Sequence, residues 1–332
     1  IKLYQGAKFE TFLAHAKPAA VQFDGGMTLL TSARIGRKKY QVDIVFPAMH
    51  GTYGEDGALM GLLDMTGIPY VGCGVAAGAV AMDKVLAKQL AAANNLPTSA
   101  FLAFHKYEIV DDTQKVAKTI TTKLKYPLFV KPAHLGSSIG ITRVQNDTEL
   151  INALEVAVHY DDFVVVEEAV PNLVEVTLPI MGLPENPQPA LLEQPLTASE
   201  DFFDFDTKYM HQGGKKGGGK KSGVKGSQGY SQVPAKLSKE LYKKAEDLGV
   251  AVYRAFGCTG IARVDMLIDE KAVKVYFNEI NPLPGSLYAL NWAQVGVSNV
   301  DLVQKLVQFA LDRHDAREKL ATTFDTNFLK QF

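Results

Sequence analysis

The chain has 332 residues, of which 47% are hydrophobic and 21% charged, and this is the balance of an ordinary globular protein of two or three domains. A formal net charge of −1 argues against a dedicated binder of nucleic acid. No apolar run reaches the roughly 20 residues that a membrane-spanning helix needs, and no signal peptide is visible. The two cysteines, Cys73 and Cys258, form neither a disulfide framework nor a zinc motif, which favours a reducing compartment such as the cytoplasm.

The first interpretable stretch predicts a βαβ unit. Val42–Phe46 is a short apolar run typical of a buried parallel strand, a helix is expected over Ala58–Thr66, and Ile68–Gly72 predicts a second strand. The glycine-rich loop between the first strand and the helix contains His50. Because open α/β sheets bind ligands at the carboxyl ends of their strands, His50 is a candidate site residue, with a purely structural histidine as the alternative.

Two lysines are expected on one face of the next helix. Ala79–Asn94 is rich in Ala, Leu and Lys, which are strong helix formers, and Lys84 and Lys88 lie four residues apart. A solvated lysine stripe is the alternative interpretation.

A hairpin with a flexible tip follows. Tyr126–Pro132 predicts a strand that ends near Lys131, and Ile141–Val144 predicts its partner. The tip between them, Gly136–Gly140, includes Ser137 and Ser138. It is not a P-loop, because the glycine–lysine order is absent and a strand follows. Backbone N–H groups and hydroxyls at such a tip can hold phosphate oxygens, whereas an ordinary surface hairpin is the competing view.

The helix expected over Asp147–His159 leads into the apolar strand Phe163–Glu168, which ends in two carboxylates. Glu167 and Glu168 at the end of a buried strand suit hydrogen bonds to a base and a ribose. A strand that simply reaches the surface is the alternative.

One segment is of low complexity. Residues 211–232 hold eight glycines and five lysines, a composition typical of a flexible coil. A basic flexible loop beside a phosphate site can act as a lid, and Lys208 and Tyr209 would anchor its start. A disordered surface loop and a nucleic-acid tether are the alternatives.

Oxygen ligands for a hard cation come near the C-terminal end, between helices expected at Leu237–Phe256 and Asp301–Arg313. Asp265 follows one strand-like segment, and Glu279 and Asn281 share one face of the next, since alternate residues of a strand point the same way. Such ligands suit a divalent cation that also takes phosphate oxygens, and an edge strand with a polar turn is the alternative.

Eight motifs follow one another along the chain: Phe46-Pro47-x-x-His50-Gly51 with Gly54-Glu55-Asp56-Gly57, Met82-Asp83-Lys84, Phe129-Val130-Lys131-Pro132-Ala133, Gly136-Ser137-Ser138-x-Gly140, Lys208-Tyr209, Arg263-Val264-Asp265 and Asn278-Glu279-Ile280-Asn281. In this order they closely resemble the D-alanine–D-alanine ligases, which make the dipeptide terminus of peptidoglycan precursors for the cell wall. The resemblance covers roughly Val42 to Ala310. It implies an α/β (α+β) ATP-grasp fold of three domains, with the nucleotide between two sheet-containing lobes.

The domains would be 1–75 (substrate-binding, apparently lacking its first strand and helix), 76–172 (central) and 173–332, with a lid at about 204–233. The resemblance implies that ATP and two Mg²⁺ ions (possibly Mn²⁺) bind here. Nucleotide ligands would be Lys84, Lys131, Ser138, Glu167, Glu168, Val170, Glu175 and Lys208. Metal ligands would be Asp265, Glu279 and Asn281. Catalytic and positioning roles would fall to Arg263, Ser137, Tyr209 and Gly285, and substrate contacts to His50, Ser286 and Leu287.

The sequence also departs from the family. No Gly-Gly-x-Ser-x-Glu segment precedes Gly51, and Gly285 runs straight into Ser286 without the usual intervening residues. Three alternatives therefore stay open beside D-alanine ligation: a D-alanine–D-lactate ligase, against which Tyr209 argues, another ATP-grasp ligase, and a catalytically silent nucleotide-binding homologue. A homodimer is expected, with neither nucleic-acid nor membrane partners.

Overall fold

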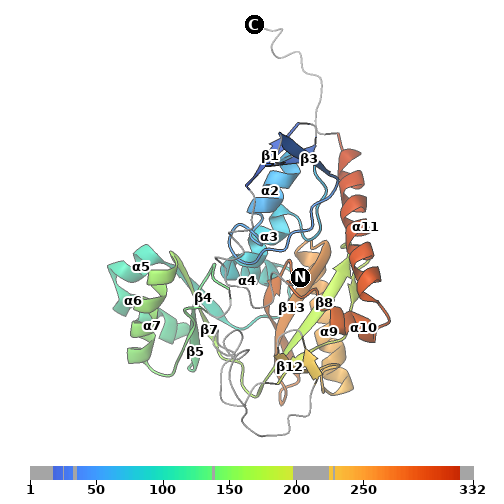
Figure 1. Ribbon diagram of the computed structural model, residues 1–332. Helices are drawn as coiled ribbons and strands as arrows, with labels where there is room; N and C mark the ends of the chain where they lie inside the picture. Colours follow the sequence, from blue (N-terminus) through green and yellow to red (C-terminus); the bar gives the residue numbers. More distant parts are fainter. Residues whose placement is uncertain are drawn as a thin grey trace, which may run out of the picture.

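The computed structural model describes residues 18–24, 26–32, 36–136, 139–196, 224–226 and 229–321. Ser137, Ser138, Lys208, Tyr209 and most of the expected lid lie outside these ranges. Figure 1 shows one lobe standing apart on the left, and a larger body on the right that carries the N-terminal elements at its top. None of the helices in the described part of the chain is long and apolar enough to cross a membrane.

The N-terminal part begins with an antiparallel sheet of β1 (Ala19–Phe23), β2 (Met27–Ser32) and β3 (Arg37–Val42), followed by α2 (Ala58–Met65). The expected helix is confirmed, but the parallel strand Val42–Phe46 is wrong in its extent. Val42 closes β3, and only Val45 pairs in parallel with Tyr70, as an isolated bridge. Proline lacks the N–H that a ladder needs, so Pro47 and Pro69 on either side keep this pairing short.

The expected helix Ala79–Asn94 is wrong as one element, because the chain forms α3 (Val75–Met82) and α4 (Lys84–Ala93). The break falls at Asp83, which is extended and accepts hydrogen bonds from the N–H groups of Val85 and Leu86. An aspartate cap satisfies the first free donors of a helix, so α4 begins at Lys84.

The separate lobe holds an antiparallel sheet in the order β4-β7-β5-β6, with helices packed against it (Figure 1). Its strands are β4 (Phe101–His105), β5 (Leu128–Pro132), β6 (Thr142–Val144) and β7 (Phe163–Glu168). The helices are α5 (Lys106–Asp111), α6 (Thr113–Lys123) and α7 (Asp147–Tyr160). The β5–β6 pairing confirms the expected hairpin, and the strand Phe163–Glu168 is also confirmed.

The larger body is built on a sheet in the order β14-β13-β8-β9. Its strands are β8 (Leu173–Gly182), β9 (Gln188–Pro189), β13 (Gly260–Asp269) and β14 (Lys274–Asn281). The helices are α9 (Lys239–Ala255), α10 (Ala289–Gln294) and α11 (Asn299–Glu318). A small sheet of β10 (Gln194–Pro195), β11 (Val224–Gly226) and β12 (Gly229–Gln232) completes it. The apolar face of α9 and one face of the large sheet form the main core.

The domain division stays a prediction. Residues of α3 and α4, which we assigned to the central domain, share the main core with β8, β13 and α9. The lobes meet where the Phe277 N–H donates to the Pro97 carbonyl over 2.8 Å and the Thr98 hydroxyl donates to the Phe277 carbonyl over 3.1 Å. The central lobe is therefore hydrogen-bonded to β14, the strand that carries two of the expected metal ligands.

Arg313 of α11 joins the N-terminal part to the larger body. The Arg313 guanidinium stacks 4.2 Å from the Tyr70 ring centroid and donates to the Tyr70 carbonyl over 2.8 Å. It also donates to the Thr259 hydroxyl over 2.7 Å. These contacts fix the segment before α3 against the start of β13.

Candidate active site

Four polar residues form a block on one face of two paired strands. Asp265 pairs with Glu279 across β13 and β14, and Arg263 pairs with Asn281 two residues along. Directly paired residues of an antiparallel sheet share a face, as do residues two apart on one strand. The structure therefore brings together the three expected metal ligands and the expected catalytic arginine.

Arg263 is held against the two carboxylates that we expect to bind metal. Its Nε donates to Asp265 Oδ1 over 2.7 Å, its Nη2 donates to Asp265 Oδ2 over 2.5 Å, and Nη2 lies 3.7 Å from Glu279 Oε1. Burial alone would lower the pKa of Arg263, but the charges of Asp265 and Glu279 outweigh burial and raise the pKa. The Arg263 guanidinium thus places a positive charge beside both carboxylates. Hard carboxylate and amide oxygens are also the donors that Mg²⁺ prefers, so the residues fit this metal.

The sequence missed an extension of this block. Thr177 of β8 pairs with Asp265, and Glu193 forms a bridge with Thr177, so oxygen-bearing side chains share a face across four neighbouring backbone segments. Both residues are buried, and neither the Thr177 hydroxyl nor the Glu193 carboxylate has a hydrogen-bond partner among the described residues. No sequence spacing could have revealed this row, because only sheet register places Glu193 near Asp265.

A buried carboxylate lies between two lysines in the central lobe. Glu167, 1% exposed, forms ion pairs with Lys131 through Oε1 and with Lys88 through Oε2, the latter over 2.6 Å. Its Oε2 also accepts from the Ser99 hydroxyl over 2.7 Å. Burial raises the pKa of Glu167, but the two lysines outweigh burial and hold it far below its usual range.

This arrangement bears on two expectations. The Glu167 carboxylate is engaged by Lys131 and Lys88, and its expected contact with the nucleotide stays a prediction. The alternative of a solvated lysine stripe is wrong for Lys88, which is 1% exposed and also donates to the Thr98 and Ser99 hydroxyls. A lysine buried this deeply needs such partners, because an unpaired buried charge is costly.

Lys84 lies at the junction of the two lobes. Its Nζ donates to the Leu135 carbonyl over 2.5 Å. The pKa of Lys84 is lowered, chiefly by burial and also by the charge of Lys131, while the charge of Glu279 opposes this shift. The ammonium therefore lies within electrostatic range of both a metal-ligand carboxylate and the second expected phosphate lysine.

The remaining expected nucleotide ligands line the end of β7 and the start of β8. Glu168 accepts from the Lys125 N–H over 2.8 Å, and Val170 is half-buried nearby. Glu175 lies two residues before Thr177 on β8 and hence on the face that carries Asp265. These three residues are partly accessible, unlike Glu167.

The loop after Val45 meets the loop after β14. The His50 ring packs on Gly285 so closely that a Cβ there would overlap the ring, and His50 Nδ1 lies 3.9 Å from Glu55 Oε1. The pKa of Glu55 is raised, because the effect of burial exceeds the lowering effects of the Gly51 N–H, His50 and Arg263. Glu55 is a site residue that we did not single out, although it lies in the Gly54–Gly57 motif.

The segment after Gly285 has an unusual backbone. Ser286 is exposed and its Oγ accepts from the Tyr288 N–H over 3.3 Å. Leu287 and Tyr288 have φ angles of 50° and 53°, a left-handed conformation that is uncommon for residues other than glycine. Backbone strain of this kind collects at functional sites.

Comparison with known proteins adds independent findings. Family models described as D-ala D-ala ligase N-terminus and D-ala D-ala ligase C-terminus match residues 10–73 and 90–308. The D-alanine–D-alanine ligase of Natranaerobius thermophilus is 38% identical over 288 residues, which are 86% of this chain and 74% of that protein. The corresponding ligase of Acetivibrio thermocellus is 36% identical over 86% of this chain and 72% of its own length.

The chain belongs to the D-alanine–D-alanine ligase family. It is accordingly an ATP-dependent ligase, which confirms the expected family and enzyme class.

Solved structures agree with this assignment. The D-alanine–D-alanine ligase of Coxiella burnetii superposes with a TM-score of 0.74 at 28% identity, covering 93% of this chain and 81% of that one. The VanG D-Ala:D-Ser ligase of Enterococcus faecalis gives a TM-score of 0.74 at 29% identity, covering 91% and 82%. The ATP-grasp fold class is thereby confirmed.

The buried ion pairs of Glu167 predict strong coupling between their partners. Lys88→Met should lower the free energy of unfolding by about 3 kcal/mol, because it leaves a buried carboxylate undercompensated. The double variant Lys88→Met/Glu167→Gln should lose less than the sum of the two single losses, as measured by urea unfolding at pH 7. Lys243→Met, which breaks the exposed pair with Asp247, is the control and should change little. Strict additivity would contradict the prediction.

The same carboxylate predicts an acid dependence. Because the folded state lowers the pKa of Glu167, its contribution to stability is present above the ordinary value of 4.5 and is lost as pH falls below it. The wild-type free energy of unfolding should therefore fall more steeply between about pH 5 and 3 than that of Glu167→Gln. Parallel urea titrations across this range measure the difference, and equal slopes would refute it.

Gly285 should tolerate no side chain. Gly285→Ala is expected to displace the His50 ring or the loop and to lower ligase kcat/KM on the order of tenfold or more, since small misplacements at an active site are costly. Gly61→Ala on α2, where a Cβ meets nothing closer than 4.0 Å, is the matched control. Thermal unfolding separates lost activity from lost folding, and a fully active Gly285→Ala would show that the contact is unimportant.

Proposed function

We propose that this protein joins two D-alanines into D-alanyl-D-alanine for peptidoglycan synthesis, with ATP as the energy source and Mg²⁺ as the metal. The observation that carries the proposal is the block of Arg263, Asp265, Glu279 and Asn281 on one sheet face, with Lys84 at the start of α4 within electrostatic range of Glu279. The relatives named above support the substrate, since their names give D-alanine as the residue joined.

The nucleotide would lie between the lobes. Lys84 and Lys131 offer positive charge for its phosphates, and the Glu167 counter-ion holds Lys131 in place. Glu168, Val170 and Glu175 border the space in which the adenine and ribose would lie. Ser138 and Lys208, outside the described residues, complete the proposed nucleotide contacts.

Magnesium would be held by Asp265, Glu279 and Asn281, and the number of ions and any use of Mn²⁺ are part of this proposal. When bound, the metal would neutralise charge on the phosphate oxygens. Arg263 is engaged with Asp265, so metal binding there would leave its guanidinium available to substrate.

The chemistry follows from these charges. An amine cannot displace the oxygen of a free carboxylate, so ATP first phosphorylates the carboxylate of one D-alanine. The amine of the second D-alanine then attacks, and phosphate leaves. Arg263 and the Gly285 N–H would stabilise the oxyanion of that step, in which preorganised donors supply most of the acceleration.

Substrate contacts would come from both loops. His50 would lie near the first D-alanine, and Ser286 and Leu287 near the second, beside the strained backbone. Ser137 and Tyr209, outside the described residues, would pair to position substrate and lid. We further propose a cytoplasmic homodimer.

The second substrate has a specific alternative. Gly285 is followed directly by Ser286 and packs on His50, so this loop lacks the intervening residues that are usual in the family. One similar structure is named a D-Ala:D-Ser ligase, which makes D-serine a candidate second substrate. A panel of D-alanine, D-serine and D-lactate as second substrates distinguishes these activities by the mass of the product.

The central test measures ADP release with D-alanine, ATP and Mg²⁺. Arg263→Ala should lower kcat by about 10²–10³, the range found when one oxyanion donor is removed. Asp265→Asn should weaken Mg²⁺ binding, which calorimetry can follow without turnover. Arg254→Ala on α9, an exposed arginine that donates to the Pro184 carbonyl, is the control.

Near-normal turnover of Arg263→Ala would reject its role. Tight binding of Mg-ATP with no D-alanine-dependent ADP release by the wild type would indicate a silent nucleotide-binding homologue. Release that requires D-serine or D-lactate would change the substrate and leave the nucleotide site unaffected.

A further inference from the structure

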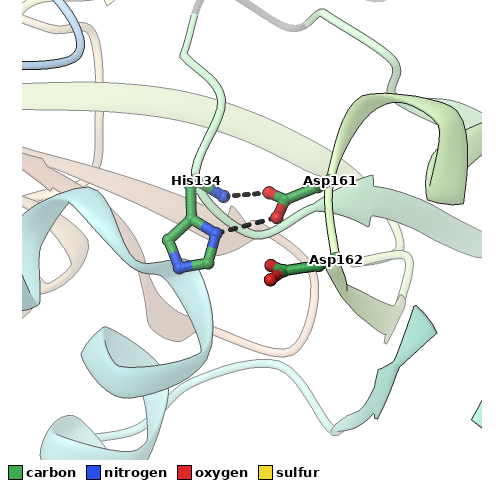
Figure 2. A group of neighbouring side chains, drawn as sticks. All are labelled: His134, Asp161 and Asp162. Carbon is green, nitrogen blue, oxygen red and sulfur yellow. Dashed lines mark hydrogen bonds and ion pairs between the residues drawn. The ribbon is translucent and has the colours of Figure 1, made fainter. Parts of the chain in front are cut away.

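His134 lies two residues after the end of β5, and its side chain lies among carboxylates from other elements (Figure 2). Its Nδ1 lies 2.8 Å from Asp161 Oδ1, and its backbone N–H donates to Asp161 Oδ2 over 2.7 Å. Its Nε2 lies 3.4 Å from Asp83 Oδ2. Asp161 ends α7 and Asp83 caps α4, so one histidine connects three segments of the chain.

This cluster could be taken for a metal centre, because the nearest ligand atoms of His134, Asp161 and Asp162 lie within 4.8 Å of one another. The contacts argue otherwise. Asp161 Oδ1 also accepts from the Phe163 N–H over 3.2 Å, and Asp161 Oδ2 is engaged by the His134 backbone. Both oxygens are already bonded to protein donors, as in an ion pair.

The neighbours of His134 hold the start of α4. The Lys84 N–H donates to the Ala133 carbonyl over 3.0 Å, and Lys84 Nζ donates to the Leu135 carbonyl. Three consecutive residues after β5 thus contact two consecutive residues at the start of α4. The Lys84 ammonium is held at this junction, and His134 contributes an ionisable side chain to it from the segment after β5.

The surroundings favour the charged imidazole. Burial lowers the pKa of His134, but Asp161, Asp83 and Asp162 outweigh burial and raise it. The other charged group at the junction is Lys84 of α4, which interacts with Asp161. Because the folded state raises this pKa, the contribution of His134 is full below about pH 6.5 and is lost as pH rises through the folded value.

We propose that His134, as an imidazolium paired with Asp161 and Asp83, is a positioning residue that fixes Lys84 for the terminal phosphates of the nucleotide. The inference rests on the proposed nucleotide site and adds to it a residue to which neither the motifs nor the comparisons assign a role. His134 acts through Lys84 and contacts no phosphate itself.

The test measures dissociation constants of Mg-ATP and of AMP from pH 6 to 9. As pH rises, the dissociation constant of Mg-ATP should increase more for the wild type than for His134→Gln. The extra increase should be on the order of threefold to tenfold, as expected for a partly exposed ion pair. His134→Gln should bind as the wild type does at high pH, and AMP should be unaffected in both. The titration of ATP itself is common to both proteins and cancels in the comparison.

Two variants sharpen the result. His134→Arg keeps a permanent charge and should retain tight Mg-ATP binding at high pH. Asp161→Asn should move the pH midpoint of the wild-type profile downward, because it removes the strongest partner of the imidazolium. His159→Gln on α7, whose ring contacts the Glu155 carbonyl over 2.7 Å, is the matched control and should match the wild type.

The inference would be overturned if His134→Gln bound Mg-ATP with the same pH dependence as the wild type. It would also be overturned if the variant bound Mg-ATP and AMP more weakly by the same factor. Failure of the wild type to bind Mg-ATP at any pH would instead refute the proposed function. The two failures are therefore distinguishable.

Discussion

The arrangement of the central lobe depends on one buried carboxylate, that of Glu167. Glu167 forms ion pairs with Lys131 and Lys88, and both lysines are less than a tenth exposed. Lys88 in turn donates to the Thr98 hydroxyl, which donates to β14 at Phe277. The ion pairs of Glu167 are thus linked, through Lys88 and Thr98, to the strand that carries two of the proposed metal ligands. Removing either charge alone would leave the other without compensation.

In the larger body, polar side chains are brought together by the register of two paired strands. Because Asp265 pairs with Glu279 and Arg263 with Asn281, two acids, one amide and one guanidinium form a compact patch. Arg263 neutralises Asp265 directly. A guanidinium is always charged, so it holds the acids in place without a metal. In the proposed site, metal binding and the availability of the arginine would therefore be linked through one carboxylate.

The site is closed by loops that belong to neither sheet. His50 packs on Gly285, and Glu55 is buried beside it, so the N-terminal part contributes to the proposed substrate end of the site. Arg313 holds that part in position through the Tyr70 carbonyl and ring. At the opposite end, His134 connects the segment that follows β5 to the start of α4, the helix that carries Lys84. In both places the contacts that matter join residues far apart in the sequence.

The sequence alone determined the ligase family, the hairpin around Lys131, the strand ending at Glu167 and the alternation that puts Glu279 and Asn281 on one face. These are local properties, since period, turn residues and short motifs act over a few positions. Tertiary structure decided the rest. The capping bond of Asp83 divided the expected helix, burial turned Lys88 from a surface charge into an ion-pair partner, and register brought Thr177 and Glu193 beside Asp265. Pairing, burial and register depend on distant segments that meet only when the chain folds, so no local pattern contains them.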